Sequence, residues 1–444
     1  MNSVQNKTYF IETYGCQMNV ADSELVEALL KREGYKPAPK LEDADAIFVN
    51  TCAIREHAEE KVHSQLGRYR KIKQRKRDVI IGVLGCMAQS LKHDLLENRP
   101  YVDIILGPDS YRKLPKILNR SQRDHSSQVD TTLSRFEVYD DLFPSRQEGI
   151  NAWISIMRGC DKFCTFCIVP FTRGRERSRS VEGIVAEVSQ AVADGFVEVT
   201  LLGQNVNSYR HNDHQFHHLL EAVAQTPGLK RIRFTSPHPQ DITADLLDTM
   251  ARHGNICNYI HLPLQAGNDR ILKRMNRTYT QQHFLTLVRN IRQSLPDAGI
   301  STDIIVGFPG ETEIEFQDTL AVMNEVKFDS AFMFKYSSRR GTKAADYEDQ
   351  VAEKEKQHRL EKVIDLQKGH TLERNQALIG RNETVLVEKV SKKAANQWAG
   401  RTDSNKWVIF NKEDAQIRDM VTVKITKTAG ISLQGHLVAQ AEAA

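Results

Sequence analysis

Three cysteines form a Cys-x3-Cys-x2-Cys run in the stretch Arg158-Gly159-Cys160-Asp161-Lys162-Phe163-Cys164-Thr165-Phe166-Cys167. A 4Fe–4S cluster is normally held by four thiolates, so this run leaves one iron free to bind a substrate or cofactor. Zinc is the alternative, but zinc sites usually combine Cys-x2-Cys pairs with further ligands. No second such pair occurs anywhere in the chain. The run therefore favours an iron–sulfur cluster with one open iron.

Three further cysteines, Cys16, Cys52 and Cys86, each follow an apolar stretch that is predicted to be a strand. These stretches are residues 8–13, 46–50 and 79–84. Apolar residues at helical spacing follow the first two stretches, and such alternation of strands and helices indicates a parallel sheet. Ligands bind at the carboxyl edge of a parallel sheet. One buried cysteine is an ordinary apolar core residue, but three at equivalent strand ends predict a second cluster with an open iron.

The remainder of the chain divides into two regions of different pattern. After the polar stretch 121–128, which is typical of a linker, strand candidates separated by helices occur at residues 154–157, 197–202, 232–235, 259–262, 304–307 and 330–334. A charged helix over residues 351–375 ends this region. Beyond Gly380 the pattern favours a small five-stranded β-barrel, with strands at residues 384–388, 397–401, 406–410, 421–425 and 431–438.

These features together resemble the methylthiotransferases of the radical S-adenosylmethionine (SAM) superfamily. The resemblance is carried by the Cys160 run and by the motifs TYGCQMN (13–19), NTC (50–52) and LGC (84–86). It continues downstream in the motifs LGQNVNSY (202–209), SPHP (236–239), HLPLQAG (261–267) and DIIVGFPGET (303–312). The matching stretches extend over nearly the whole chain.

The resemblance implies an α/β protein of three domains. An N-terminal parallel-sheet methylthiotransferase domain (residues 7–123) would carry the auxiliary cluster, and a linker (124–145) would lead to the radical SAM core (146–376). That core is expected to be a partial (βα)6 barrel. The last segment (379–441) is similar to the TRAM domain, a small RNA-binding β-barrel.

The resemblance also implies a reaction that uses two 4Fe–4S clusters. The cluster on the strand-end cysteines would carry the sulfur to be inserted, which one SAM molecule would methylate. The cluster on the Cys160 run would cleave a second SAM to a 5′-deoxyadenosyl radical. This radical would abstract hydrogen from C2 of N6-isopentenyladenosine at position 37 of a tRNA. Because an aromatic C–H has no acidic proton for an ordinary base, such chemistry falls to a cofactor-derived radical.

Polar residues at predicted strand ends are candidates for contact with SAM or with the substrate. They are Gln204, Asn205, Ser236, His238 and Gln265. Cys257 precedes a predicted strand and matches no ligand motif, so we expect it to be packed in the core. The histidines show no ligand spacing. The sequence assigns no catalytic residue.

The distribution of charge gives a separate indication of an RNA partner. The formal net charge is +4, and residues 381–444 hold +3 of it, with ten Lys/Arg against seven Asp/Glu. Small β-barrels present basic grooves and aromatic faces to RNA, and Trp398, Trp407 and Phe410 are candidates for such faces. Basic runs are often solvated surface, but two of them together favour a phosphate-bearing partner. They lie at residues 68–77 and at Arg173, Arg175, Arg177 and Arg179.

Compartment and further partners follow from bulk properties and from the resemblance. No stretch has the apolar length of a membrane span, and the N-terminus lacks the pattern of a signal peptide, so we expect a cytoplasmic protein with no membrane partner. A monomer is expected. The resemblance implies an electron donor such as a flavodoxin-type reductant, and iron–sulfur assembly proteins, as partners besides tRNA.

Other functions stay open at this point. A sibling methylthiotransferase with the same six cysteines would act on an adenosine that bears threonylcarbamoyl, or on a ribosomal-protein aspartate. A non-enzymatic iron–sulfur RNA-binding protein would sense redox state instead. The mass of the product separates the methylthiotransferases from one another, and SAM cleavage by the reduced protein would exclude the redox sensor.

Overall fold

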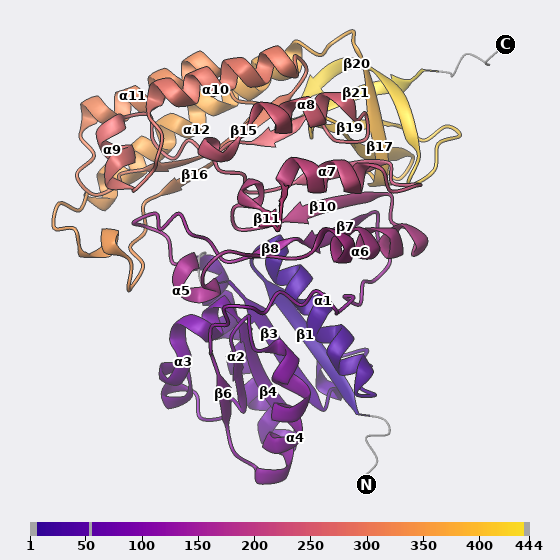
Figure 1. Ribbon diagram of the computed structural model, residues 1–444, viewed down its shortest axis with the longest axis vertical. Coiled ribbons are helices and arrows are strands. Elements are labelled where there is room, and N and C mark those ends of the chain that lie inside the picture. The colour runs from indigo at the N-terminus through magenta and orange to yellow at the C-terminus, as the bar shows by residue number, and fades with distance from the viewer. Residues whose placement is uncertain (1–6, 53–55, 439–444) are drawn as a thin grey trace.

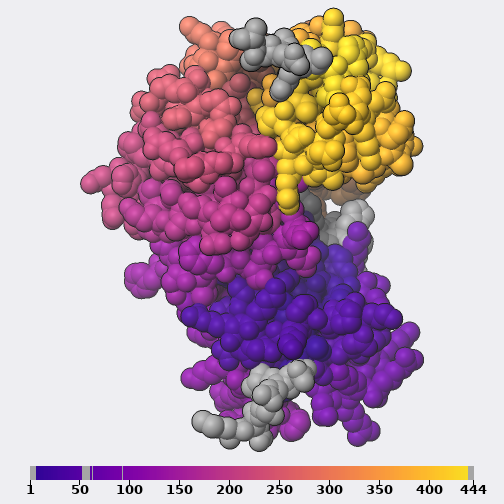
Figure 2. Space-filling model, turned by 90° about the vertical axis from the view of Figure 1, so that its right-hand side faces the viewer, coloured from indigo at the N-terminus to yellow at the C-terminus, as the bar shows by residue number. Residues whose placement is uncertain are grey.

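The computed structural model describes residues 7–52 and 56–438 of the chain. Figure 1 shows an N-terminal sheet with its helices, a central unit with an outer layer of helices, and a small barrel near the C-terminus. The N-terminal and central units meet in the middle of the molecule (Figure 1). Figure 2 shows the small barrel seated against the central unit, at the end of the molecule opposite the N-terminal sheet.

The N-terminal unit is a parallel sheet with helices on both faces. Its strand order is β2-β1-β3-β4-β5-β6, and the strands are β1 (Thr8–Tyr14), β2 (Lys36–Pro37), β3 (Ala46–Thr51), β4 (Ile80–Gly85), β5 (Ile104–Leu106) and β6 (Gln128–Asp130). One face packs on α1 (Gln17–Arg32) and α4 (Leu114–Asp124), and the other packs on α2 (Glu56–Arg75) and α3 (Cys86–Asn98). Because both faces are covered, β3 and β4 are buried along their whole length.

The segment 124–145, which we predicted to be a linker, contributes in part to this unit. Its strand β6 pairs with β5 in parallel, with Ile105 opposite Val129. The ring of Tyr139 stacks near that of Tyr111, with 6.1 Å between the centroids. A short polar edge strand is held mainly by backbone hydrogen bonds, which leave no hydrophobic pattern in the sequence. The exact domain boundaries stay predictions.

The central unit is an open barrel of parallel strands. One sheet has the order β13-β10-β7 and a second has the order β14-β15-β16, and an isolated parallel bridge between Ile232 and Ile256 joins them. The strands are β7 (Asn151–Ser155), β10 (Glu198–Leu202), β13 (Arg231–Phe234), β14 (Tyr259–His261), β15 (Gly299–Val306) and β16 (Ser330–Lys335). These elements confirm the predicted partial (βα)6 barrel.

Helices form the outer layer of the central unit, which also contains several short elements. The outer helices are α6 (Val181–Ala193), α7 (Phe216–Ala224), α8 (Ala244–Arg252), α9 (Asp269–Arg274), α10 (Gln281–Ser294), α11 (Glu313–Val326) and α12 (Glu353–Gln376). The short elements are β8 (Met157–Arg158), α5 (Val169–Arg173), β9 (Arg177–Ser178), β11 (Arg210–His211) and β12 (His214–Gln215). The barrel core between strands and helices is one continuous apolar cluster.

The small barrel is closed, with the strand order β17-β18-β19-β21-β20. Its strands are β17 (Asn382–Val390), β18 (Gln397–Thr402), β19 (Trp407–Asn411), β20 (Met420–Ala429) and β21 (Ser432–Leu437). The predicted five-stranded barrel is therefore confirmed. Trp398 and Phe410 belong to its core, so neither ring is available as an RNA-binding face. Trp407 is half-buried, and Lys389 lies over its ring at 4.1 Å from the centroid.

Buried charges fix the small barrel to the central unit. The Arg233 guanidinium on β13 donates to the carbonyl oxygen of Thr402 at 2.9 Å. Arg401 on β18 pairs with Glu198 on β10 at 2.8 Å. Lys406 pairs with Asp329 at 2.8 Å. Removing the barrel would leave Glu198 and Asp329 without these partners, so the two units are expected to depend on one another for stability.

Within the described ranges, no helix is both long and apolar enough to cross a membrane.

Candidate cluster and cofactor site

The three strand-end cysteines gather at the carboxyl edge of the N-terminal sheet. Cys16 caps α1, Cys52 follows β3, and Cys86 is the first residue of α3. A hydrogen bond with the Cys52 side chain lowers the pKa of Cys16 to about 6. A Cβ atom on Gly15, which has a φ of +127°, would lie 2.6 Å from the Cβ of Cys52. Glycine at this position therefore permits the close approach of the two strand ends.

A pair of buried amides holds this edge together and explains two of the sequence motifs. The Asn19 side-chain amide donates to Asn50 Oδ1 at 3.1 Å, and Asn50 Nδ2 donates back to the carbonyl oxygen of Asn19 at 3.0 Å. A Cβ on Gly85, whose φ is +89°, would collide with Asn50 Oδ1. Residues next to each cysteine therefore pack against the strand ends that carry the other cysteines.

The Cys160 run forms a loop at the carboxyl ends of the barrel strands. The N–H of Cys160 donates to the carbonyl oxygen of Gly174 at 3.1 Å, and the N–H of Cys167 donates to that of Cys164 at 2.9 Å. The ring of Phe166 lies edge-on to Phe308, with 6.4 Å between centroids. Phe308 lies just beyond Gly307 at the end of β15, so the aromatic residue between the last two cysteines anchors the loop to the barrel.

The environment of the loop thiols favours their binding, as thiolates, to a cationic group. Burial raises the pKa of Cys160 and of Cys167 to about 12, so these thiols need a strong compensating charge to become thiolates. Coordination of iron supplies such compensation, because metal binding displaces the protons of thiol ligands. The half-buried Arg277 donates to Cys164 Sγ at 3.3 Å. The donor set therefore fits an iron–sulfur cluster.

Among residues 7–52 and 56–438, no three His, Cys, Asp or Glu side chains are gathered closely enough to hold a single metal ion. The thiolates of a four-iron cluster each bind a different iron. Such ligands consequently stand further apart than the ligands of one ion.

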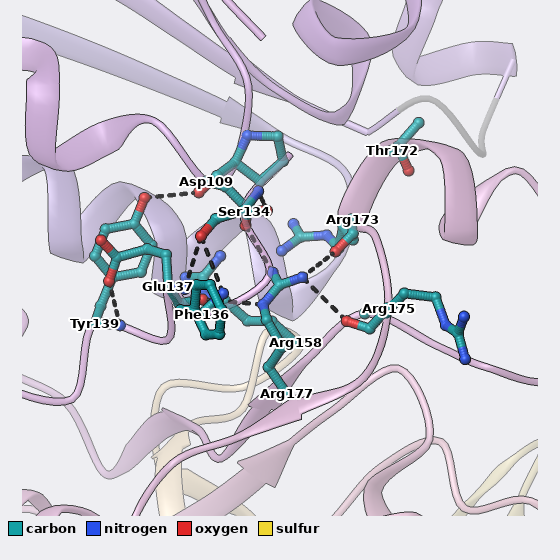
Figure 3. A network of polar contacts seen from close by, with 12 residues as sticks. Asp109, Ser134, Phe136, Glu137, Tyr139, Arg158, Thr172, Arg173, Arg175 and Arg177 are labelled. Carbon is teal, nitrogen blue, oxygen red and sulfur yellow. Dashed lines mark hydrogen bonds and ion pairs between the residues drawn. The ribbon is translucent and has the colours of Figure 1, made fainter. Parts of the chain in front are cut away.

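A buried ion network joins the two sets of cysteines. Asp22 on α1 accepts from Arg158 at 2.6 Å and from Arg173 at 2.7 Å. Arg173 Nε also donates to Cys86 Sγ at 3.2 Å. Figure 3 shows Tyr139, Arg158 and Arg173 in the adjoining contacts of Arg177, and the Arg158 guanidinium lies over the Tyr139 ring at 4.6 Å from its centroid. The two cysteine-bearing units are thus held together next to Cys86.

The arginines after the cysteine run correct one prediction. We expected these four arginines to favour a phosphate-bearing partner, but three of the four guanidinium groups are buried in ion pairs within the chain. Arg173 pairs with Asp22, Arg177 pairs with Asp109, and Arg179 pairs with Asp140 and Glu187. Arg175 is the exposed member, and it pairs with Asp161. These arginines therefore stabilise contacts within the chain rather than bind a phosphate group.

Two of the predicted strand-end residues keep buried side-chain oxygens that lack a hydrogen-bond partner within the described part of the chain. These atoms are Asn205 Oδ1 and Gln265 Oε1. The Asn205 amide nitrogen donates to Asp241 at 2.9 Å, which orients the free oxygen. Gln265 has a φ of +67°, and its backbone is fixed by hydrogen bonds to β15. Each oxygen can accept a hydrogen bond from a bound molecule.

The other three predicted residues have different surroundings. Gln204 Oε1 accepts the N–H of Gly159 at 2.6 Å and so supports the cysteine loop. Ser236 is exposed and has a φ of +58°. Burial lowers the pKa of His238 to about 2, so this ring is neutral, and its Nδ1 accepts the N–H of Gln240 at 3.3 Å. Contact of these residues with SAM or substrate stays a prediction.

Sequence reasoning missed the charged residues that surround the cysteines. Asp22, Arg158 and Arg277 matched no motif that we had used. Arg158 lies just before the cysteines of the Cys160 run and Arg173 lies a short helix after them, so their position could have indicated a role beside the run. Cys257, which we expected in the core, is buried.

Comparison with known proteins assigns the three units. The chain matches "Uncharacterized protein family UPF0004" over residues 8–107, "Radical SAM superfamily" over residues 154–323 and "TRAM domain" over residues 376–438. The tRNA-2-methylthio-N(6)-dimethylallyladenosine synthase of Bacteroides thetaiotaomicron is 47% identical over 98% of this chain and 96% of its own. That of Christiangramia forsetii is 45% identical over 96% of this chain and 93% of its own. The chain belongs to this family. The predicted resemblance to radical SAM methylthiotransferases is thereby confirmed.

Solved structures support the same fold. The radical SAM methyltransferase TsrM from Kitasatospora setae, solved with cobalamin and a [4Fe-4S] cluster, has a TM-score of 0.58 to this chain. The two share 13% sequence identity over 77% of each chain, so the likeness concerns the fold alone. Membership of the radical SAM superfamily implies SAM and a 4Fe–4S cluster as cofactors.

Proposed function

We propose that the protein inserts a methylthio group at C2 of N6-isopentenyladenosine at position 37 of tRNA. SAM would serve as methyl donor and as radical source. The observation that carries the proposal is the pair of cysteine sets at strand ends of two adjoining units, in a chain that is up to 47% identical to named synthases of this product. The TRAM match supports tRNA as the partner.

Each cysteine set is proposed to hold one 4Fe–4S cluster. Cys16, Cys52 and Cys86 would hold the auxiliary cluster, and Cys160, Cys164 and Cys167 would hold the cluster that binds SAM. When bound, these groups supply the radical, the sulfur and the methyl group that the reaction needs. The chain itself holds one set of ligands at the edge of the N-terminal sheet and the other in the barrel loop, and Arg173 joins the two units next to Cys86.

Buried oxygens near the loop are proposed to orient SAM. Asn205 Oδ1 and Gln265 Oε1 are buried acceptors without partners among the described residues, and an ammonium group is a strong donor for such oxygens. Both residues stand at the carboxyl ends of barrel strands, on the same side as the Cys160 loop. They would fix the bound cofactor in one orientation.

An aromatic face on β16 is proposed to receive the target base with its isopentenyl group. Met333 packs with the apolar core that also contains residues of α12, so its neighbours Phe332 and Phe334 point to the opposite, inner face of the strand. Their side chains are 56% and 47% exposed. Along the same face, Tyr336 contacts Phe308 at 5.3 Å between centroids. Since Phe308 contacts Phe166, this face leads to the cysteine loop.

Replacing Phe334 with alanine should raise the KM for isopentenylated tRNA about tenfold. Stacking of a base on an aromatic ring is worth about 1–3 kcal/mol, and about 1.4 kcal/mol corresponds to a factor of ten. The measurement is methylthio insertion by the anaerobic protein with SAM and a reductant, on tRNA with and without the isopentenyl group. The wild-type protein should act on the isopentenylated tRNA and leave the other unmodified.

A matched control is Phe136→Ala, because Phe136 is 87% exposed and lies outside the barrel. This variant should keep the wild-type KM. Equal turnover of both tRNAs by the wild-type protein would overturn the proposed substrate. An unchanged KM in Phe334→Ala, with the wild-type preference intact, would overturn only the role of the aromatic face.

Basic residues of the small barrel are proposed to contact tRNA phosphates. Lys392 and Lys393 are exposed in the turn between β17 and β18, and Lys424 and Lys427 are exposed on β20. Each lysine that neutralises a phosphate releases a counterion, which makes binding weaken as salt rises. Because the barrel supplies partners to Glu198 and Asp329, substitution of these exposed lysines is a cleaner test than deletion of the barrel.

The double substitution of Lys392 and Lys393 by glutamine should weaken tRNA binding and flatten its salt dependence. Loss of two phosphate contacts should reduce the slope of log K against log salt by about 1–2. Binding isotherms at several salt concentrations measure this slope. Substitution of Lys354 and Lys368, which are exposed on α12, is the control. If both double variants changed the slope equally, the barrel would have no special part in binding.

The remaining partners stay predictions. They are the flavodoxin-type electron donor, the iron–sulfur assembly proteins, the monomeric state and the cytoplasmic location where tRNA is found.

A further inference from the structure

We propose that Arg173 is a positioning residue that holds the Cys86 thiolate and raises the reduction potential of the auxiliary cluster. The inference rests on the proposed function, because it requires a cluster on Cys16, Cys52 and Cys86. It assigns a role to a residue outside every cysteine motif.

The contacts of Arg173 place it between the two cysteine-bearing units. It is the last residue of α5, which follows the Cys160 loop in the central unit. Its Nε donates to Cys86 Sγ at 3.2 Å, and its terminal nitrogen pairs with Asp22 Oδ2 at 2.7 Å. Both of these partners belong to the N-terminal unit. Arg173 is therefore a donor from one unit to a predicted ligand in the other.

Burial makes these contacts strong. The side chains of Arg173 and Asp22 are 3% and 0% exposed. Water cannot screen charges at such a position, and a buried guanidinium needs anionic partners and hydrogen-bond acceptors. Figure 3 shows a further contact of this segment, in which Arg177 donates to the backbone carbonyl oxygen of Arg173.

The charges of the network do not balance within the described residues. Asp22 is one carboxylate shared by two guanidinium groups, those of Arg158 and Arg173. The neighbouring Arg177 has its own carboxylate, that of Asp109. In the described part of the chain, Arg173 keeps a buried terminal nitrogen, Nη1, that lacks a hydrogen-bond partner. The network thus carries an excess positive charge and a spare donor next to Cys86.

An anionic cluster at this position would resolve both features. Thiolate ligands and sulfide carry negative charge, and their sulfur atoms accept hydrogen bonds from a guanidinium. Hydrogen bonds to the sulfurs and nearby charge set the potential of an iron–sulfur cluster. A buried cation favours the reduced form, which carries one more negative charge. Arg173 is therefore expected to raise the reduction potential of the cluster and to orient the ligand that it contacts.

The test measures the auxiliary cluster alone. The full-length Cys164→Ala protein, reconstituted anaerobically with iron and sulfide, serves as parent because its Cys160 loop lacks one ligand. Adding Arg173→Gln should lower the midpoint potential of the reduced-cluster signal in electron paramagnetic resonance. Adding Arg173→Lys, which keeps the charge but loses the planar donor, should give a smaller shift in the same direction.

A matched control is Arg112→Gln in the same parent. Arg112 approaches Tyr139 and pairs with Glu137 and Asp141 at the surface, and within the described residues none of its hydrogen bonds or ion pairs reaches a cysteine. This variant should keep the parent potential. Selective loss of iron from Arg173→Gln, with an unfolding midpoint equal to the parent, would also support the positioning role.

Potentials of the two Arg173 variants equal to that of the parent would overturn the inference. Should Arg173→Gln fail to fold, full iron loading and an unchanged potential in Arg173→Lys would overturn it as well. A parent protein without any cluster would instead contradict the proposed function. The two failures are therefore distinguishable.

Discussion

Cys164→Ala is expected to abolish cleavage of SAM to 5′-deoxyadenosine. The Cys160 loop offers three thiols to a four-iron cluster, so loss of one leaves two irons without a protein ligand. Arg277, which donates to Cys164 Sγ at 3.3 Å, would also lose its acceptor. Chromatography of 5′-deoxyadenosine from the reduced protein, with and without tRNA, measures the effect, which should exceed a hundredfold because the cluster on this loop is the proposed source of the radical.

Cys257→Ala is the control for this experiment, since Cys257 is a buried core cysteine outside both sets. It should cleave SAM at the wild-type rate. Substantial cleavage by Cys164→Ala would remove the Cys160 loop from its proposed role.

Cys52→Ala should separate the two parts of the reaction. Cys52 belongs to the edge of the N-terminal sheet, where its side chain hydrogen-bonds with Cys16. Its loss should therefore stop methylthio insertion while SAM cleavage continues. Mass analysis of the tRNA nucleosides and of 5′-deoxyadenosine from the same reaction gives both readouts.

Iron analysis of the anaerobic proteins provides the companion measurement. The wild-type chain should hold about eight irons, and Cys52→Ala about four, as expected for two clusters and for one. About four irons in the wild-type protein would contradict two clusters. Loss of SAM cleavage together with insertion in Cys52→Ala would contradict their separate roles.

Much of the fold could be predicted because its determinants are local. The buried strands β3 and β4 are continuous apolar runs, and each is followed at once by a cysteine motif. The strands of the small barrel were found from short apolar segments between turns. The cysteine sets could be predicted for the same reason, since position at a strand end follows from strand periodicity and the parallel order of the sheet.

The contacts between units could not be predicted, because they join residues that are distant in sequence. Asp22 and Arg173 are 151 positions apart in the sequence, and neither lies in a motif that indicates contact with the other. In the sequence alone, the alternating arginines after the cysteine run are typical of a phosphate-binding surface. In the fold, most of them compensate buried carboxylates.

The burial and exposure of aromatic side chains could not be predicted from the sequence either. The sequence offered Trp398, Trp407 and Phe410 as RNA-binding faces, but the size of so small a barrel forces two of them into its core. Conversely, Phe332 and Phe334 looked like ordinary strand residues. In the structure both rings are exposed, while their neighbour Met333 packs against the core.

Mass analysis of tRNA nucleosides from cells that lack the protein tests the central claim most directly. N6-Isopentenyladenosine should accumulate, and its 2-methylthio derivative should be absent until the wild-type gene is restored. The Cys52→Ala gene should not restore it. Normal levels of 2-methylthio-N6-isopentenyladenosine in the deleted cells, or loss of the methylthio group from threonylcarbamoyladenosine instead, would contradict the proposed function.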